Sequence, residues 1–162
     1  YKVLLLRSGN YGTSTARFMV DERVIHILLV EDDEVDVMNV KRAFKKNNIT
    51  NPLYIAGNGL EALAMLRTQD SKPPAVPQER RLVLLDLNMP KMNGLEFLSE
   101  LRSDRELMAI PVIALTTSDE DKDKLEAYNL NVAGYILKPV TFSKFAEVIA
   151  TLNRYWALCE MP

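Results

Sequence analysis

The sequence predicts an α/β domain built on a doubly wound, five-stranded parallel sheet with helices on both faces. From Val24 onward, short runs of Val, Ile and Leu alternate with segments of helical periodicity, which is the order typical of such a domain. The apolar runs are short and suited to burial on both faces, as in a parallel sheet. Right-handed crossovers between parallel strands then place the helices on both faces.

Each element can be assigned from its pattern. The strands are predicted at residues 24–30, 53–56, 82–86, 112–116 and 133–137. The helices are predicted at 36–46, 60–67, 95–103, 120–128 and 142–158. Thr141 is suited to cap the last helix, and Asn131 tolerates a left-handed exit from the fourth. Prolines in the stretch 68–81 exclude a helix or an inner strand there, so this stretch is predicted to be a surface loop.

Composition restricts the class of protein. The chain has 162 residues, of which 48% are hydrophobic and 26% charged, as expected of one packed soluble domain. Its 20 basic and 22 acidic side chains give a net charge of −2, which argues against binding to nucleic acid or to a membrane surface. No apolar run reaches the roughly 18 residues that a membrane span needs. The lone Cys159 and the absence of a signal-peptide pattern favour a cytoplasmic location.

The first 22 residues fit the α/β pattern poorly. Residues 8–15 (SGNYGTST) have the composition of a phosphate-cradling loop, but a flavin site would need a whole sheet behind that loop. We therefore expect residues 1–22 to be a dispensable extension, either added to the natural chain or lying ahead of a start at Met19. Residues 23–162 are expected to form a single domain with a C-terminal helix and tail.

The predicted strands end in groups that carry chemistry. Ligands of an open parallel sheet bind beyond the carboxyl ends of its strands. Here these ends carry Glu31 and Asp32, then Asp86, Thr116 and Lys138. Carboxylates gathered at one edge repel one another unless a cation lies between them, and oxygen ligands favour a hard cation such as magnesium.

The same groups suit phosphoryl transfer, in which a protein mainly positions groups and neutralises charge. Asp86 can act as the carboxylate nucleophile. The three phosphoryl oxygens would then be covered by magnesium, by Lys138 and by the hydroxyl of Thr116.

At these positions the chain resembles the CheY-like receiver domain of two-component response regulators. The resemblance rests on residues 27–33 (ILLVEDD), 83–90 (VLLDLNMP) followed by Asn-Gly at 93–94, 113–117 (IALTT) and 134–139 (GYILKP), and it covers about residues 25 to 158. It implies a flavodoxin-like fold with strand order 2-1-3-4-5. It also implies a response regulator that signals by a surface change, and that catalyses its own phosphorylation and dephosphorylation without being an enzyme.

The resemblance also assigns roles to particular residues. It implies that Asp86 accepts phosphate from a sensor histidine kinase in a Mg²⁺-dependent reaction. Asp32, Asp86 and the backbone carbonyl of Asn88 would bind the metal directly, and Glu31 would reach it through water. Lys138 would contact the phosphoryl oxygens.

Thr116 and Tyr135 would form the switch pair of such a domain. Two departures are notable: Glu31 stands where many relatives have aspartate, and the loop 68–81 is longer than in minimal receivers. Together with the ending 155–162 (YWALCEMP), this loop is similar to the small stand-alone regulators that partner phytochromes, so a bacteriophytochrome is a candidate kinase.

Two other functions are compatible with parts of this pattern. A magnesium-dependent phosphohydrolase of the haloacid-dehalogenase type also uses an aspartate nucleophile, but it expects an acid two residues later, where this chain has Asn88. A flavodoxin-like cofactor carrier needs a glycine-rich loop after the first strand, where the acids at 31–33 would repel a phosphate.

The pattern of apolar residues in the predicted last helix indicates a homodimer. Its apolar residues follow spacings of three and four: Phe145, Val148, Ile149, Leu152, Tyr155 and Trp156. Tyr155 and Trp156 are expected to extend past the core and to expose apolar area unless a second surface covers them.

Overall fold

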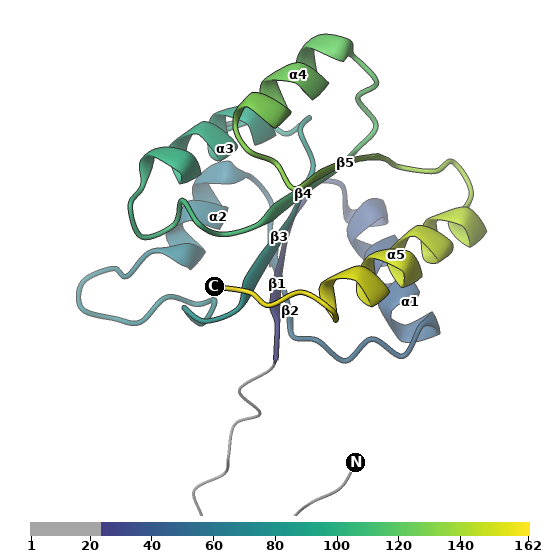
Figure 1. Ribbon diagram of the computed structural model, residues 1–162, viewed down its shortest axis with the longest axis horizontal. Helices are drawn as coiled ribbons and strands as arrows, with labels where there is room; N and C mark the ends of the chain where they lie inside the picture. The colour runs from purple at the N-terminus through teal and green to yellow at the C-terminus, as the bar shows by residue number, and fades with distance from the viewer. Residues whose placement is uncertain (1–23) are drawn as a thin grey trace, which may run out of the picture.

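The structure is a computed structural model in which residues 24–162 are described, so the expected extension at 1–22 lies outside the described residues. Five parallel strands form one sheet in the order β2-β1-β3-β4-β5 (Figure 1). This arrangement confirms the predicted fold class and strand order. The strands are β1 (His26–Val30), β2 (Leu53–Ala56), β3 (Arg81–Leu85), β4 (Val112–Thr116) and β5 (Gly134–Leu137).

Five helices cover the two faces of the sheet (Figure 1). They are α1 (Glu34–Lys46), α2 (Gly59–Leu66), α3 (Gly94–Ser103), α4 (Asp121–Asn129) and α5 (Phe142–Trp156). Alternate residues of β1 point to opposite faces, so Ile27 packs with α1 and α5 whereas Leu28 packs with α2 and α3. The sheet therefore separates two hydrophobic cores, as expected of strands buried on both sides.

Side-chain caps explain most of the helix boundaries. The Asp33 carboxylate accepts hydrogen bonds from the backbone N–H groups of Val35 (2.7 Å) and Asp36 (3.1 Å), so α1 begins two residues earlier than predicted. The Thr141 hydroxyl caps α5 as predicted, and Asn131 has the predicted left-handed conformation, with φ of 56°. α5 ends at Trp156, two residues earlier than predicted.

The expectation that Trp156 is exposed is wrong. Its side chain is 1% exposed and packs against Phe44 of α1, with 6.3 Å between the ring centroids. The tail beyond α5 also turns back onto the domain, where the carbonyl of Pro162 accepts a hydrogen bond from the N–H of Arg80 at 3.0 Å. Only Tyr155, with 52% of its surface exposed, matches the expectation of an uncovered aromatic ring.

The loop between α2 and β3 lies at the surface, as predicted, but is anchored at two points. Val76 is fully buried in the core beside α2. The guanidinium of Arg81 donates hydrogen bonds of 2.7 Å to the carbonyls of Val76 and Pro77. The three prolines of the loop further limit its conformations.

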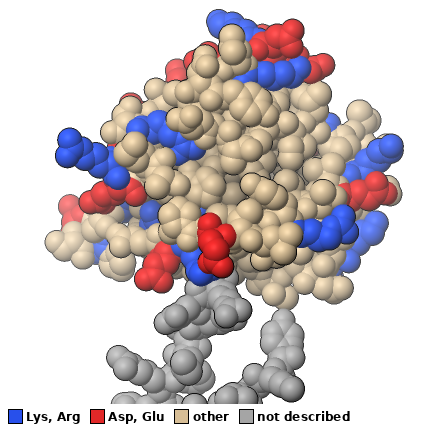
Figure 2. All heavy atoms as spheres, viewed as in Figure 1, with Lys and Arg blue, Asp and Glu red and all other residues tan. Residues whose placement is uncertain are grey.

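The surface carries charges of both signs. Figure 2 shows Lys and Arg interspersed with Asp and Glu around one face of the molecule, with uncharged residues across its centre. Within residues 24–162, no helix combines the length and the apolar character needed to cross a membrane.

Candidate functional site

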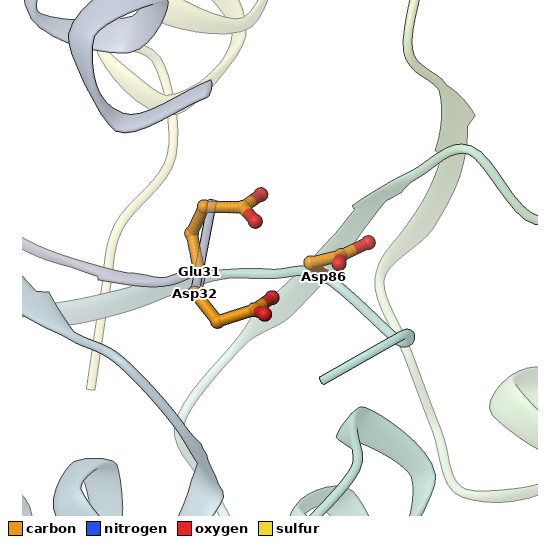
Figure 3. Close-up of side chains that lie close together, drawn as sticks. All are labelled: Glu31, Asp32 and Asp86. Atoms are coloured by element: carbon orange, nitrogen blue, oxygen red, sulfur yellow. The ribbon is translucent and has the colours of Figure 1, made fainter. Parts of the chain in front are cut away.

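Three carboxylates meet at the carboxyl edge of the sheet. Glu31 and Asp32 directly follow β1, and Asp86 directly follows the adjacent strand β3. Figure 3 shows the three side chains directed toward a common space, and one carboxylate oxygen of each lies within 4.8 Å of the others. Glu31 and Asp86 are buried, whereas Asp32 is exposed to solvent.

Backbone hydrogen bonds between neighbouring strands fix the positions of Glu31 and Asp86. The N–H of Asp86 donates to the carbonyl of Val30 at 3.0 Å, and the N–H of Glu31 donates to the carbonyl of Ala56 at 2.9 Å. These bonds continue the ladders beyond the last strand residues. The Glu31 carboxylate also accepts a 3.0 Å hydrogen bond from the N–H of Asp33, which orients it toward the cluster.

Lys138 completes the cluster from the end of β5. Its ammonium Nζ lies 2.5 Å from Oε2 of Glu31, 2.7 Å from Oδ2 of Asp36 and 3.7 Å from Oδ1 of Asp86. Only 9% of the Lys138 side chain is exposed. The lysine is therefore held mainly by Glu31 and Asp36, and it contacts Asp86 at longer range.

Burial and hydrogen bonding shift the pKa values of Glu31 and Lys138 in opposite directions. Burial raises the pKa of the Glu31 carboxyl, and this effect outweighs the hydrogen bond from Lys138, which lowers it. Burial also lowers the pKa of Lys138, but the hydrogen bonds to Asp36 and Glu31 raise it by more. The pKa of Lys138 therefore lies above its ordinary value. Lys138 is thus a persistent cation beside the carboxylates at neutral pH.

Sequence reasoning missed Asp36 because it treated this residue only as a helix start. The signal was its position in the first turn of α1, which begins at the same edge of the sheet. The pairing with Lys138 spans 102 positions of the chain and depends on how α1 packs.

The segment after Asp86 is shaped by Gly94, the first residue of α3. A Cβ at this position would overlap the carbonyl oxygen of Asp86 and lie 2.7 Å from Cα of Leu87, so only glycine allows the helix to approach so closely. Asn93 caps α3, and its N–H bonds to the Glu96 carboxylate in return, which forms a capping box. Asn88 lies exposed in this segment.

Thr116 and Tyr135 are linked through one residue, Ser118. Thr116 is fully buried at the end of β4, and its hydroxyl accepts a 3.2 Å hydrogen bond from the N–H of Ser118. The hydroxyl of Tyr135 donates to the carbonyl of Ser118 at 2.9 Å. Nothing in the sequence distinguished Ser118 from an ordinary loop serine.

The donor set fits a hard dication. Oδ1 of Asp86 is buried and accepts no hydrogen bond from the described residues, which is unfavourable unless a cation or another group completes it. Lys138 forms ion pairs with three acids of the cluster, Glu31, Asp36 and Asp86. With Asp32, the carboxylates that surround this one ammonium number four. Negative charge and oxygen ligands together suit a cation of the magnesium or manganese kind.

A doubly wound sheet with clustered acids and a lysine at its carboxyl edge defines a class of phosphoryl-accepting signalling domains. The chain belongs to the response regulator receiver domain family, whose model matches residues 27–150. The predicted resemblance is therefore confirmed. Members of this family are signalling proteins, and the phosphohydrolase alternative is not favoured.

Individual relatives are similar over most of their length. The chain is 35% identical to the probable methanogenesis regulatory protein FilR2 of Methanothrix harundinacea over 91% of this chain and 93% of that protein. It is also 35% identical to response regulator Rcp1 of Synechocystis sp., over 80% of this chain and 87% of Rcp1.

Solved structures show the same fold. The crystal structure of the phosphorylated cyanobacterial phytochrome response regulator RcpA matches with a TM-score of 0.76 and 32% identity, over 86% of this chain and 99% of that one. The Mn²⁺-bound form of Rcp1 matches with a TM-score of 0.74 and 34% identity, over 85% of this chain and 99% of that one. The chain is thus a phosphoacceptor signalling domain related to phytochrome response regulators.

Proposed function

We propose that Asp86 is the phosphoacceptor and receives its phosphoryl group from a histidine of a sensor kinase. A carboxylate oxygen of Asp86 attacks phosphorus, the bond from phosphorus to the histidine nitrogen breaks, and that nitrogen keeps the electron pair. The buried, unpartnered Oδ1 of Asp86 is the observation that carries this assignment.

Two further side chains are suited to bind the transferred group. The Lys138 ammonium lies 3.7 Å from Oδ1 of Asp86, near enough to contact a phosphoryl oxygen after a small movement. The Thr116 hydroxyl, at the end of the strand next to β3, is suited to donate to another oxygen. In contact with the phosphoryl oxygens, Lys138 and Thr116 stabilise the negative charge on the equatorial oxygens during transfer. The same contacts bind the phosphoryl group once it is attached to Asp86.

Mg²⁺ is the proposed metal of this site. The carboxylates of Asp32 and Asp86 and the backbone carbonyl of Asn88 would hold it directly, with Glu31 acting through water. When bound, the ion neutralises charge on the phosphoryl group. The oxygen donors and the excess of acids over Lys138 support this assignment, and so does the existence of a Mn²⁺-bound form of Rcp1.

Asp32→Ala is expected to weaken Mg²⁺ binding more than the replacement of any other acid in the cluster. Asp32 is the exposed member of the cluster, so its loss removes a ligand without leaving Lys138 unpaired. Calorimetric or NMR titration with Mg²⁺ measures the effect, with Glu79→Ala, an exposed acid in the α2–β3 loop, as the control. An unchanged affinity in Asp32→Ala would exclude this residue as a ligand.

The experiment that tests the proposed function is phosphorylation in solution. The protein is mixed with Mg²⁺ and acetyl phosphate, and the modified residue is located by mass spectrometry. One phosphoryl group on Asp86 is expected, and its appearance without a kinase would show that the domain catalyses its own phosphorylation. Stable modification of another residue would refute the assignment.

Thr116 and Tyr135 are proposed as the switch that reads the phosphoryl group. The added group brings nearly two negative charges and three acceptors, toward which the Thr116 hydroxyl turns. Tyr135 can then enter the vacated space, which biases the surface formed by α4, β5 and α5.

Thr116→Ala is accordingly expected to accept phosphate but to lose the change at that surface. Phosphorylation by acetyl phosphate, followed by hydrogen exchange, measures both properties in one sample. Thr117→Ala, an exposed neighbour, is the matched control and should respond like wild type. A full wild-type response in Thr116→Ala would disprove this coupling.

The kinase is inferred from the relatives. Because RcpA is a cyanobacterial phytochrome response regulator and RtBRR is a bacteriophytochrome response regulator, a bacteriophytochrome or a related sensor kinase is the proposed donor. The proposed location is the cytoplasm, a reducing compartment that suits a chain with the lone cysteine Cys159. Residues 23–162 are proposed as the receiver domain with its tail, and residues 1–22 as an extension that phosphorylation does not require.

A homodimer is proposed through the exposed end of α5 and the tail, with Tyr155 and Leu158 (52% and 87% exposed) as its apolar anchors. Light scattering on wild type and on Tyr155→Ser with Leu158→Ser is expected to show a dimer only for wild type. Trp156 is left intact because its replacement would disturb the core. A monomeric wild type, with and without phosphorylation, would contradict this proposal.

A further inference from the structure

Lys138 is bound by two acids that differ in their exposure to solvent. Its ammonium Nζ lies 2.5 Å from Oε2 of Glu31 and 2.7 Å from Oδ2 of Asp36, both within hydrogen-bond distance. Oδ1 of Asp86 lies 3.7 Å from the same nitrogen, beyond that distance. An ammonium has three N–H donors, so two of them are used by acids other than the proposed nucleophile.

The bond from Lys138 to Glu31 is costly to break. The Glu31 side chain is only 2% exposed, and a buried carboxylate that loses its cation is strongly destabilised. The other oxygen of this carboxylate, Oε1, accepts the N–H of Asp33, which keeps the group in place. Lys138 is therefore expected to keep Glu31 as a partner throughout phosphoryl transfer.

The bond from Lys138 to Asp36 can break more readily. The Asp36 side chain is 34% exposed, so water can solvate its carboxylate when the ammonium moves away. Lys138 is the one partner of this carboxylate among residues 24–162, because the Asp33 cap binds only the backbone N–H of Asp36. Breaking this bond therefore leaves the start of α1 capped.

Asp36 is also separate from the candidate metal ligands. The acids whose oxygens converge in Figure 3 are Glu31, Asp32 and Asp86, and Asp36 is not one of them. It reaches Lys138 from the first turn of α1. Asp36 can therefore act on Lys138 without binding the metal or the phosphoryl group.

We propose that Asp36 is a positioning residue that holds Lys138 away from Asp86 until the phosphoryl group arrives. This inference rests on the proposed function, in which Lys138 contacts a phosphoryl oxygen on Asp86. The ammonium exchanges the Asp36 carboxylate for that oxygen and keeps its bond to Glu31. Because the bond to Asp36 is present before transfer and absent afterwards, Asp36 slows phosphorylation without a matching effect on the loss of the phosphoryl group.

Asp36→Asn tests this asymmetry. The amide keeps the shape of the side chain but replaces a charged acceptor by a neutral one, so the bond that must break before transfer is weaker. Phosphorylation by acetyl phosphate at saturating Mg²⁺ is expected to be about fivefold faster than in wild type. After removal of acetyl phosphate, the rate of phosphate loss should stay within about twofold of wild type. Intact mass measured over time gives both rates.

Two further variants separate positioning from a general effect of charge. Glu34→Gln makes the same change of charge on an exposed acid in the same turn of α1, and both of its rates should stay within about twofold of wild type. Asp36→Glu restores the carboxylate and should return the rate of phosphorylation toward that of wild type. The inference is wrong if Asp36→Asn is phosphorylated no faster than wild type, if both of its rates change equally, or if Glu34→Gln is accelerated as much.

A double-mutant cycle on the unphosphorylated, metal-free protein tests the ion pair independently of the acceptor. In urea unfolding, Asp36→Asn should lower the folding equilibrium constant about fivefold when Lys138 is present, but should not lower it in the Lys138→Met background. An equal effect in both backgrounds would overturn the inference. Failure of Asp86 to accept phosphate, with the coupling intact, would instead overturn the proposed function.

Discussion

Asp86→Asn is expected to abolish phosphorylation of the protein by any donor while leaving the fold intact. The substitution preserves the shape of the side chain but replaces the nucleophilic carboxylate by an amide. It also removes one acid from a cluster in which acids outnumber Lys138, so the free energy of unfolding of the metal-free protein should rise slightly. Intact mass after incubation with Mg²⁺ and acetyl phosphate measures the loss, and thermal unfolding measures the stability.

The matched control is Asp70→Asn, the same chemical change in the exposed α2–β3 loop. Asp70 has φ of 48°, a conformation that asparagine tolerates, so this variant should fold and be phosphorylated like wild type. Phosphate retained in one-to-one amount by Asp86→Asn would show that another residue is the acceptor.

Lys138→Met is expected to lower the free energy of unfolding of the metal-free protein by about 3–5 kcal/mol. The side chains of Lys138 and Glu31 are only 9% and 2% exposed, so the variant leaves a buried carboxylate without its cation. Lowering the pH should restore part of the lost stability, because protonation of Glu31 removes the uncompensated charge. Urea unfolding at neutral and at mildly acidic pH measures both effects.

Lys144→Met is the control for this charge change, since Lys144 is exposed on α5 and should alter stability by no more than about 0.5 kcal/mol. If Lys138→Met were as stable as wild type, the ion pairs with Glu31 and Asp36 would not hold the site in its present form.

Much of the fold could be predicted because strands buried on both faces leave a clear pattern. The bounds of β2 and β4 were predicted in full, and those of the other strands within two residues. The meeting of Glu31, Asp32 and Asp86 could also be predicted, because the carboxyl ends of parallel strands share one edge. The expected roles of these residues stay predictions until the phosphorylated protein is studied.

The rest depended on packing between distant parts of the chain. Periodicity placed Trp156 on the apolar stripe of α5, but only the position of Phe44 on α1 shows that the indole is covered. Asp36 and Ser118 act through single hydrogen bonds to Lys138 and Asp123, which no local pattern signals. Such contacts are set by helix orientation, which follows from side-chain packing and not from spacing alone.

The buried position of Trp156 gives the protein a built-in reporter of folding. The chain has one tryptophan, and it lies beside Ile25 and Arg80, which precede β1 and β3. It is therefore at the amino edge of the sheet, separated from the carboxylate cluster by the length of a five-residue strand, roughly 16 Å. Its fluorescence follows unfolding of the α1–α5 layer with little response to metal or phosphate, so stability and ligand binding can be measured independently on the unlabelled protein.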